Sequence, residues 1–333
     1  MNNLDQINQL FKAMNISAVA ERIQDGLRTR KYLIKLSIGE KVSKIRMIVE
    51  EIALLVNSIT KPSIELDTKT GYVIIETTIS DKPLNISLDN ILKQENLNKY
   101  ILPLALGKDM DGNNIMIDLA TCPHLLIGGS TGSGKSVLIR SMIKTLVSKH
   151  DPSDLQLVLI DPKGTELSEM KDSPYTACHI SIYQKCEEVF NQLTRLMETR
   201  YQMFTKYNVK KLEELRQHKK EPYIVVVIDE LADLLLKDKK QDNILTKFII
   251  LIQKSRAAGI HIVVNTQRPS RDVINGLIQD NIETRIALKT VSHHNSKLII
   301  GQAGAENLVG MGDMLVKHQG KITRVQGAMW KKY

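Results

Sequence analysis

The chain has 333 residues, of which 42% are apolar, so it is long enough for two domains with a substantial core. Its formal charge of +9 favours a polyanionic partner, although a lysine-rich solvated surface carries the same excess. An aromatic content of only 4% argues against base stacking on single strands, so duplex phosphates are the expected contact. Three cysteines without metal-ligand spacing predict a reduced, cytoplasmic setting, and no apolar run approaches the length of a membrane span.

The first segment of the chain predicts a small α+β domain over residues 1–95. Its predicted elements are, in chain order, a helix (1–27), a strand (28–37), an amphipathic helix (40–58) and two short strands (62–66 and 72–79). The polar stretch 81–99 makes a plausible joint. From Leu102 onward strands alternate with helices, which predicts an α/β core with a doubly wound, mainly parallel sheet over residues 96–333.

A phosphate-binding loop opens this second domain. It follows the apolar run 124–127 and precedes the apolar-periodic segment 137–147, which is the strand, loop and helix setting that the motif requires. Its glycines let backbone N–H groups close on the β- and γ-phosphates of a nucleotide, while Lys135 neutralises phosphate charge and Ser136 holds Mg²⁺. The residues of the loop are Gly129, Ser130, Thr131, Gly132, Ser133, Gly134, Lys135 and Ser136.

Three further apolar runs predict parallel strands that end in polar residues at the same edge of the sheet. The run 223–228 ends in Asp229 and Glu230, where Asp229 suits the outer shell of Mg²⁺ and Glu230 is placed to polarise the attacking water. The alternative for this acidic pair is an ordinary helix start. The runs 155–160 and 259–264 end in Asp161-Pro162-Lys163 and in Asn265 to Pro269.

One residue of the last run, Gln267, has two open interpretations. Its amide can hydrogen-bond the γ-phosphate or the attacking water and so report which nucleotide is bound. It can equally satisfy the backbone of its own loop.

These motifs resemble those of the FtsK/SpoIIIE-type DNA translocases, in the cytosolic motor region, over nearly the whole chain. The segments that carry the resemblance are residues 103–109, 123–136, 160–168, 198–201, 229–234, 255–261, 266–270, 304–306 and 310–315.

The resemblance implies a RecA-like ATPase core that forms a hexameric ring around double-stranded DNA, with ATP at each subunit interface. It implies that residues 1–95 are the small first domain of the motor and that Arg256 is an arginine finger for the neighbouring subunit. Taken by itself, Arg256 would be an ordinary surface arginine. A guanidinium suits the finger because it stays charged and offers planar donors to transition-state oxygens.

Three features depart from the family pattern. The chain starts without membrane spans and ends without a winged-helix domain, so we expect loading or direction to depend on a protein partner. Gln279 and His293 stand in pore-loop regions where lysine is frequent, which leaves Arg268, Lys289 and Lys297 as the candidate phosphate contacts. The pair His293-His294 is interpreted as a solvated loop, since adjacent side chains rarely share one metal ion.

Two other functions remain open at this stage. Related ATPases of the same superfamily drive protein secretion or conjugation, and a nucleotide site does not separate these from a DNA motor. A duplex-binding ATPase that grips DNA without walking is the third possibility.

Overall fold

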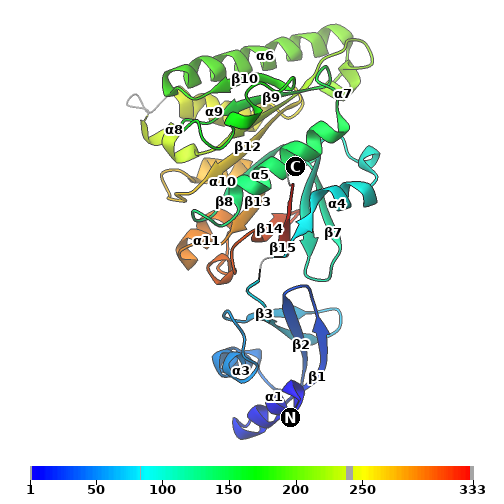
Figure 1. Ribbon diagram of the computed structural model, residues 1–333, viewed down its shortest axis with the longest axis vertical. Helices are drawn as coiled ribbons and strands as arrows, with labels where there is room; N and C mark the ends of the chain where they lie inside the picture. Colours follow the sequence, from blue (N-terminus) through cyan, green and yellow to red (C-terminus); the bar gives the residue numbers. More distant parts are fainter. Residues whose placement is uncertain (1, 83, 238–242, 331–333) are drawn as a thin grey trace. The chain divides into compact units, whose positions relative to one another are not determined.

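The computed structural model describes residues 2–82, 84–237 and 243–330, which form two compact units (Figure 1). The first unit contains Met1–Leu84, Lys108–Asn113 and Asn307–Val309, and the second contains Asn85–Gly107, Asn114–Glu306 and Gly310–Tyr333. The predicted boundary after residue 95 falls inside the second unit, directly behind α4 (Leu88–Gln94). Within the described ranges, no helix combines the length and the apolar character that a bilayer crossing requires.

The first unit is an antiparallel sheet covered by helices. The strands lie in the order β1-β2-β4-β3, and their apolar side chains pack with those of α1 and α3 around the fully buried Phe11, Ile34 and Ile52. The elements are α1 (Asn3–Ala13), β1 (Ala18–Asp25), β2 (Thr29–Leu36), α2 (Val42–Met47), α3 (Val49–Leu55), β3 (Ser63–Asp67) and β4 (Tyr72–Thr78).

The predicted helix over residues 1–27 is wrong in its second half. Helix α1 ends at Ala13, and Asn15 adopts a left-handed conformation with φ of 52°, so that the N–H of Ile16 returns to the carbonyl of Phe11. The chain then enters β1, whose residues are mostly exposed because it is an edge strand. An edge strand with little buried surface has a weak alternating pattern, which explains the error.

The predicted helix over residues 40–58 is interrupted. It forms as α2 and α3, with Ile48 between them in a non-helical conformation (φ −106°, ψ 15°). Ile45, Ile48, Val49 and Ile52 are buried on the face that the apolar pattern predicted.

The second unit is a large mixed sheet in the order β10-β9-β11-β12-β8-β13-β14-β15-β6-β7. The strands from β10 to β13 are parallel, and β14 and β15 continue the sheet in antiparallel register. The strands are β5 (Ile86–Ser87), β6 (Pro103–Asp109), β7 (Asn114–Asp118), β8 (His124–Gly128), β9 (Leu155–Ile160), β10 (Thr176–Ile180), β11 (Tyr223–Ile228), β12 (Ile260–Thr266), β13 (Thr284–Leu288), β14 (Asp313–His318) and β15 (Lys321–Met329).

Helices cover both faces of this sheet. Every residue of β11 and β12 is buried, which requires apolar neighbours on both sides. Side chains of α5 pack in one core with Val225 and Val227. Helices α9 and α11 contact β12 and β13, and α6 packs on α9 (Figure 1). The remaining helices are α5 (Lys135–Lys149), α6 (Cys186–Tyr207), α7 (Leu212–Leu215), α8 (Leu231–Lys237), α9 (Asn243–Lys254), α10 (Gly276–Asn281) and α11 (His293–Ile300).

Candidate nucleotide site

The phosphate loop lies between the end of β8 at Gly128 and the start of α5 at Lys135. Gly132 and Gly134 adopt positive φ angles of 75° and 108°, which side chains other than hydrogen rarely allow. The first N–H groups of α5 are without a side-chain cap. These N–H groups and the positive end of the helix dipole form an anion-binding site.

Lys135 is buried, with 4% of its surface exposed, and its ammonium contacts the backbone of the phosphate loop. Its Nζ donates to the carbonyl oxygens of Gly129 (2.8 Å) and Ser130 (2.7 Å). Burial lowers the pKa of Lys135 to about 8, while the carboxylates of Glu230 and Asp229 act in the opposite direction. An ammonium has three donors, so the two internal contacts leave one for a phosphate oxygen.

Gln267 links the phosphate loop to the acid at the end of β11. Its Oε1 accepts a hydrogen bond from Thr131 Oγ1 (2.8 Å), and its backbone N–H donates to Glu230 Oε2 (2.8 Å). The side chain of Gln267 thus contacts the phosphate loop, and its backbone contacts the acid; a contact with the γ-phosphate or the attacking water stays a prediction.

Glu230 is held by three donors in a nearly inaccessible position, with 2% of its surface exposed. Its Oε1 accepts from Thr266 Oγ1 (2.7 Å) and from the N–H of Ala232 (3.2 Å), and Oε2 accepts from Gln267. Each carboxylate oxygen accepts two hydrogen bonds, so Oε2 retains one acceptor direction for a water molecule. The alternative of a plain acidic helix start does not explain the bond to Thr266, which comes from a different strand.

Asp229 has an acceptor oxygen that the described residues leave unused. Its Oδ1 accepts from Asn265 Nδ2 (3.2 Å), but its buried Oδ2 and the buried Oδ1 of Asn265 have no hydrogen-bond partner among the described residues. Burial, followed by the nearby carboxylate of Asp161, raises the pKa of Asp229 to about 6. These two oxygens without a partner, one on Asp229 and one on Asn265, fit a hydrated Mg²⁺, whose bound waters would donate hydrogen bonds to them. Ser136, on the first turn of α5, is the partner that would hold the ion directly.

Asp161 and Thr266 are site residues whose contacts the sequence analysis missed. Asp161 is fully buried and accepts four backbone N–H bonds, from Lys163, Gly164, Glu166 and Leu167, at 2.9–3.2 Å. It therefore shapes the loop after β9, next to Asp229. The signal was an Asp followed by Pro and Gly at the end of a strand, which favours a side-chain-capped turn. Thr266 gave no such signal, because its bond to Glu230 depends on strand order.

Arg256 lies at the amino-terminal ends of the strands, whereas the phosphate loop lies at their carboxyl ends. It is exposed in the turn before β12, whereas Gln267 directly follows that strand. Seven residues of extended chain span roughly 20 Å, which exceeds the reach of an arginine side chain. Arg256 therefore does not reach the phosphate loop of the same chain.

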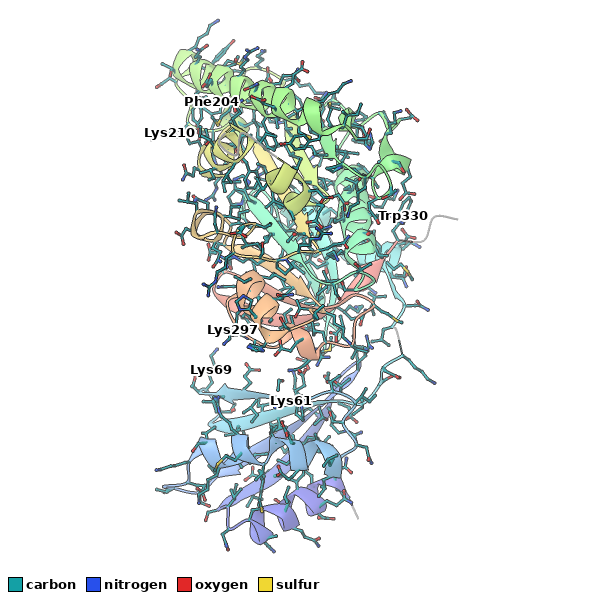
Figure 2. The ribbon with its side chains drawn as sticks, turned by 90° about the vertical axis from the view of Figure 1, so that its left-hand side faces the viewer. Lys61, Lys69, Phe204, Lys210, Lys297 and Trp330 are labelled. Carbon is teal, nitrogen blue, oxygen red and sulfur yellow. The ribbon has the colours of Figure 1, made fainter. Side chains whose placement is uncertain are left out.

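The candidate DNA contacts are exposed. Arg268 follows β12 and Lys289 follows β13. Lys297 lies on α11 and is labelled in Figure 2. The carbonyl oxygen of Lys289 accepts hydrogen bonds from the N–H (2.8 Å) and the Oγ (3.0 Å) of Ser130, so this segment contacts the phosphate loop.

Gln279 and His293, the departures from the expected lysines, both lie on helices. Gln279 is on α10, where its Nε2 donates to the carbonyl of Ile274 (3.1 Å). His293 and His294 are exposed but begin α11, so the predicted loop is helical. Among the described residues no group of three or more histidine, cysteine, aspartate or glutamate side chains is arranged to hold a metal ion, at the histidine pair or elsewhere.

The fold and the loop together define a class. A mainly parallel sheet with helices on both faces, a phosphate loop between β8 and α5 and acids at the end of β11 are the features of a P-loop ATPase with a RecA-like core. The solved structure of the pCW3 conjugation coupling protein TcpA with ATPγS has this fold, with a TM-score of 0.70 and 23% identity over 99% of this chain and 95% of that chain. The predicted fold class is confirmed.

The chain belongs to the FtsK/SpoIIIE family, whose model matches residues 88–221 and 212–271. A DNA translocase FtsK from Haemophilus influenzae is 35% identical over 98% of this chain and 68% of its own length. The DNA translocase FtsK of Chlamydia trachomatis serovar D is 36% identical over 97% of this chain and 42% of its own length. This chain thus spans less than half of several relatives. The predicted resemblance and the prediction of a P-loop ATPase of this family are confirmed.

Proposed function

We propose that this protein hydrolyses ATP to move double-stranded DNA through a hexameric ring in the cytoplasm. The observation that carries the proposal is the position of Arg256 at the sheet edge opposite its own phosphate loop. A cation that cannot reach its own site suits a composite site, completed by a second copy of the chain. A ring gives every phosphate loop such a neighbour.

The chemistry assigned to each side chain follows from its contacts. Lys135 and the N–H groups of α5 hold the β- and γ-phosphates, Ser136 and Asp229 hold Mg²⁺, and Glu230 takes the proton of the attacking water. When bound, Mg²⁺ would offset the negative charge of the phosphates. Gln267 couples the γ-phosphate region to Glu230, because it contacts Thr131 with its side chain and Glu230 with its backbone. Arg256 of a neighbour stabilises the charge of the transition state.

Duplex DNA is the proposed cargo for two reasons. The relatives that cover this chain almost completely are described as DNA translocases, and the formal charge of +9 suits a phosphate backbone. Arg268, Lys289 and Lys297 are exposed and available for phosphate contacts. A protein that loads the ring or sets its direction completes the proposal.

The cargo is tested by measuring ATPase activity with linear duplex, with single strands and without nucleic acid. We expect stimulation by duplex in the native chain and no activity in Lys135→Ala, which serves as the negative control. Displacement of a triplex strand from the duplex then separates walking from gripping. Stimulation without displacement would establish a gripping ATPase, and a lack of any DNA response would favour the secretion or conjugation role.

The composite site is tested by mixing two inactive variants. Arg256→Ala keeps its phosphate loop and Glu230→Gln keeps its arginine, so an interface between the two is complete. We expect each variant to lose about 10² to 10³-fold in turnover alone and the mixture to recover activity. No recovery at any ratio, with co-assembly verified by affinity tags, would contradict a finger that acts across an interface.

A further inference from the structure

The motif Arg200-Tyr201, on α6, has no part in the nucleotide site and none in the DNA contacts described so far. Arg200 is fully buried, whereas 38% of the surface of Tyr201 is exposed. Both side chains nevertheless reach the same place, the turn between α9 and β12 that carries Arg256. Their hydrogen bonds to this turn lead to an inference that deepens the proposed function and rests on it.

The two side chains hold backbone carbonyls on either side of Arg256. The hydroxyl of Tyr201 donates to the carbonyl oxygen of Lys254 (2.6 Å), two residues before the arginine. Arg200 Nη1 donates to the carbonyl oxygen of Ala258 (2.6 Å), two residues after it. The turn is thus tied to α6 at both ends, and the only long polar side chain between the two ties that points to solvent is Arg256.

The rest of the turn is closed by its own bonds. The N–H of Gly259 donates to the carbonyl of Arg256 (3.0 Å), and Ser255 Oγ donates to the carbonyl of Ile260 (2.8 Å). Gly259 has a φ of 68°, and a Cβ at this position would lie 2.1 Å from Leu212 Cδ2. The backbone around Arg256 is therefore fixed, although its side chain is exposed.

Burying the Arg200 guanidinium opposes the stability of the fold. Burial lowers the pKa of Arg200, and its Nε has no hydrogen-bond partner among the described residues. Its other contacts are Nη2 to the carbonyl of Pro222 (2.6 Å) and to Glu221 (3.5 Å). Replacing such buried ions by apolar side chains is often neutral or stabilising, so packing alone is a poor reason for a guanidinium here.

We propose that Arg200 and Tyr201 are positioning residues that set the backbone under Arg256, so that its guanidinium reaches the nucleotide site of the neighbouring subunit. Phosphoryl transfer depends on placement, and displacements of the order of 1 Å are enough to lose about 10²-fold in rate. A fixed backbone also reduces the conformational entropy that the exposed arginine loses on entering that site. The two residues act through Arg256 and not on the substrate.

The test uses the full chain with Arg200→Lys and Tyr201→Phe combined. The lysine keeps the charge near Glu221, but its single nitrogen replaces the two guanidinium nitrogens that contact the carbonyls of Ala258 and Pro222 separately. The phenylalanine removes only the hydroxyl, and its ring stays against Phe204 (5.5 Å between centroids). We expect unchanged ATP affinity and a fall in turnover of about 10-fold or more. Tyr207→Phe, on the same helix, is the matched control, because no hydrogen bond of the Tyr207 hydroxyl occurs among the described residues.

Mixing then separates positioning from a general structural role. The doubly substituted subunit keeps an intact phosphate loop, so dilution with Glu230→Gln subunits should raise its turnover per subunit severalfold. Dilution with Arg256→Ala subunits should give no rise, because both then lack a working finger. If the double variant is unfolded in thermal melts, the same two mixing experiments are done with Tyr201→Phe alone.

Two outcomes would overturn the inference. One is wild-type turnover in the substituted chain. The other is a defect that Glu230→Gln subunits do not relieve, while the same subunits do restore Arg256→Ala. If Arg256→Ala is not restored either, the composite site of the proposed function fails as well, so the two failures are distinguishable.

Discussion

Lys135 and Asp229 both carry charge in a place where burial opposes it. The pKa of Lys135 is lowered to about 8 and that of Asp229 is raised to about 6, in each case mainly by burial. Phosphate favours the charged form of the lysine, and Mg²⁺ favours the charged form of the aspartate. A bound nucleotide with Mg²⁺, as proposed for this site, would therefore stabilise the charged forms of both residues at once.

Glu230→Gln is predicted to separate ATP binding from hydrolysis. Glutamine keeps the size of the side chain and an acceptor for the N–H of Gln267, but it no longer takes a proton from water. We expect nucleotide affinity within a few fold of the native value and single-turnover hydrolysis lower by roughly 10²-fold or more. Glu213→Gln, at the start of α7, is the control. Lost binding with normal turnover per bound ATP would make Glu230 a ligand and not the base.

At the residue scale, the sequence was informative where chemistry depends on residue type and short spacing. The phosphate loop and the Asp229-Glu230 pair could be recognised because each is contiguous and follows an apolar run. The clamp of Glu230 by Thr266 and the orphaned oxygen of Asn265 could not, since they depend on β11 and β12 being neighbours in the sheet. Strand order is a long-range property that no local pattern encodes.

The phosphate loop is also packed, as an element, against the turn before β14. The N–H of Gly312 donates to the carbonyl of Ser133 (2.8 Å), and a Cβ on Gly134 would lie 2.7 Å from the backbone nitrogen of Gly312. The loop and this turn must therefore keep a close backbone contact. Gly132 also has a positive φ, but its Cβ would meet nothing within 4 Å.

Gly134→Ala is accordingly predicted to damage the site more than Gly132→Ala. Both substitutions strain a left-handed backbone by about 1–2 kcal/mol, and only the first also forces the two backbones apart. We expect weaker ATP binding and a lower melting temperature for Gly134→Ala, measured by nucleotide titration and thermal unfolding. Equal effects of the two substitutions would show that the contact with Gly312 is unimportant.

Among the elements, buried strands were easier to predict than exposed ones. The run Tyr223–Ile228 is apolar throughout because it is covered on both faces, and its boundaries agree with the prediction. The edge strand β1 buries little and was taken for helix, although Asn15 offered a stop signal for α1. The break at Ile48 has no sequence signal that we can identify, because its apolar side chain continues the buried face.

For the whole molecule, two buried histidines at the amino edge of the sheet predict a loss of stability in acid. Burial, together with the neighbouring histidine, lowers the pKa of His124 to about 3, and burial lowers that of His261 to about 4. In the unfolded chain these two histidines take up protons below about pH 6.5, whereas in the folded protein they stay neutral until the pH is much lower. Stability is therefore full above that pH and declines as the pH falls toward 4, by roughly 3 kcal/mol per histidine.

His124→Asn tests this linkage. The Nδ1 of His124 accepts the N–H of Ile262 (3.2 Å), and an asparagine Oδ1 can accept the same bond without titrating. We expect the free energy of unfolding, from urea titrations between pH 7 and pH 4.5, to fall less steeply in this variant. His293→Asn, which changes an exposed histidine, should leave the slope as it is. An unchanged slope in His124→Asn would refute the assignment.

The proposed DNA binding would involve the assembled molecule, and its salt dependence would count the phosphate contacts. Each neutralised phosphate contributes about −0.9 to the slope of log affinity against log salt for duplex DNA. If Lys297 contacts a phosphate, Lys297→Gln should make the slope less negative by about 0.9 per subunit contact, equally for unrelated sequences. Lys210, which is exposed in a different part of the second unit, supplies the control Lys210→Gln (Figure 2). If the slope changes in both variants, or in neither, Lys297 is not part of the DNA-binding surface. Affinity for one particular sequence that persists at high salt would contradict phosphate recognition altogether.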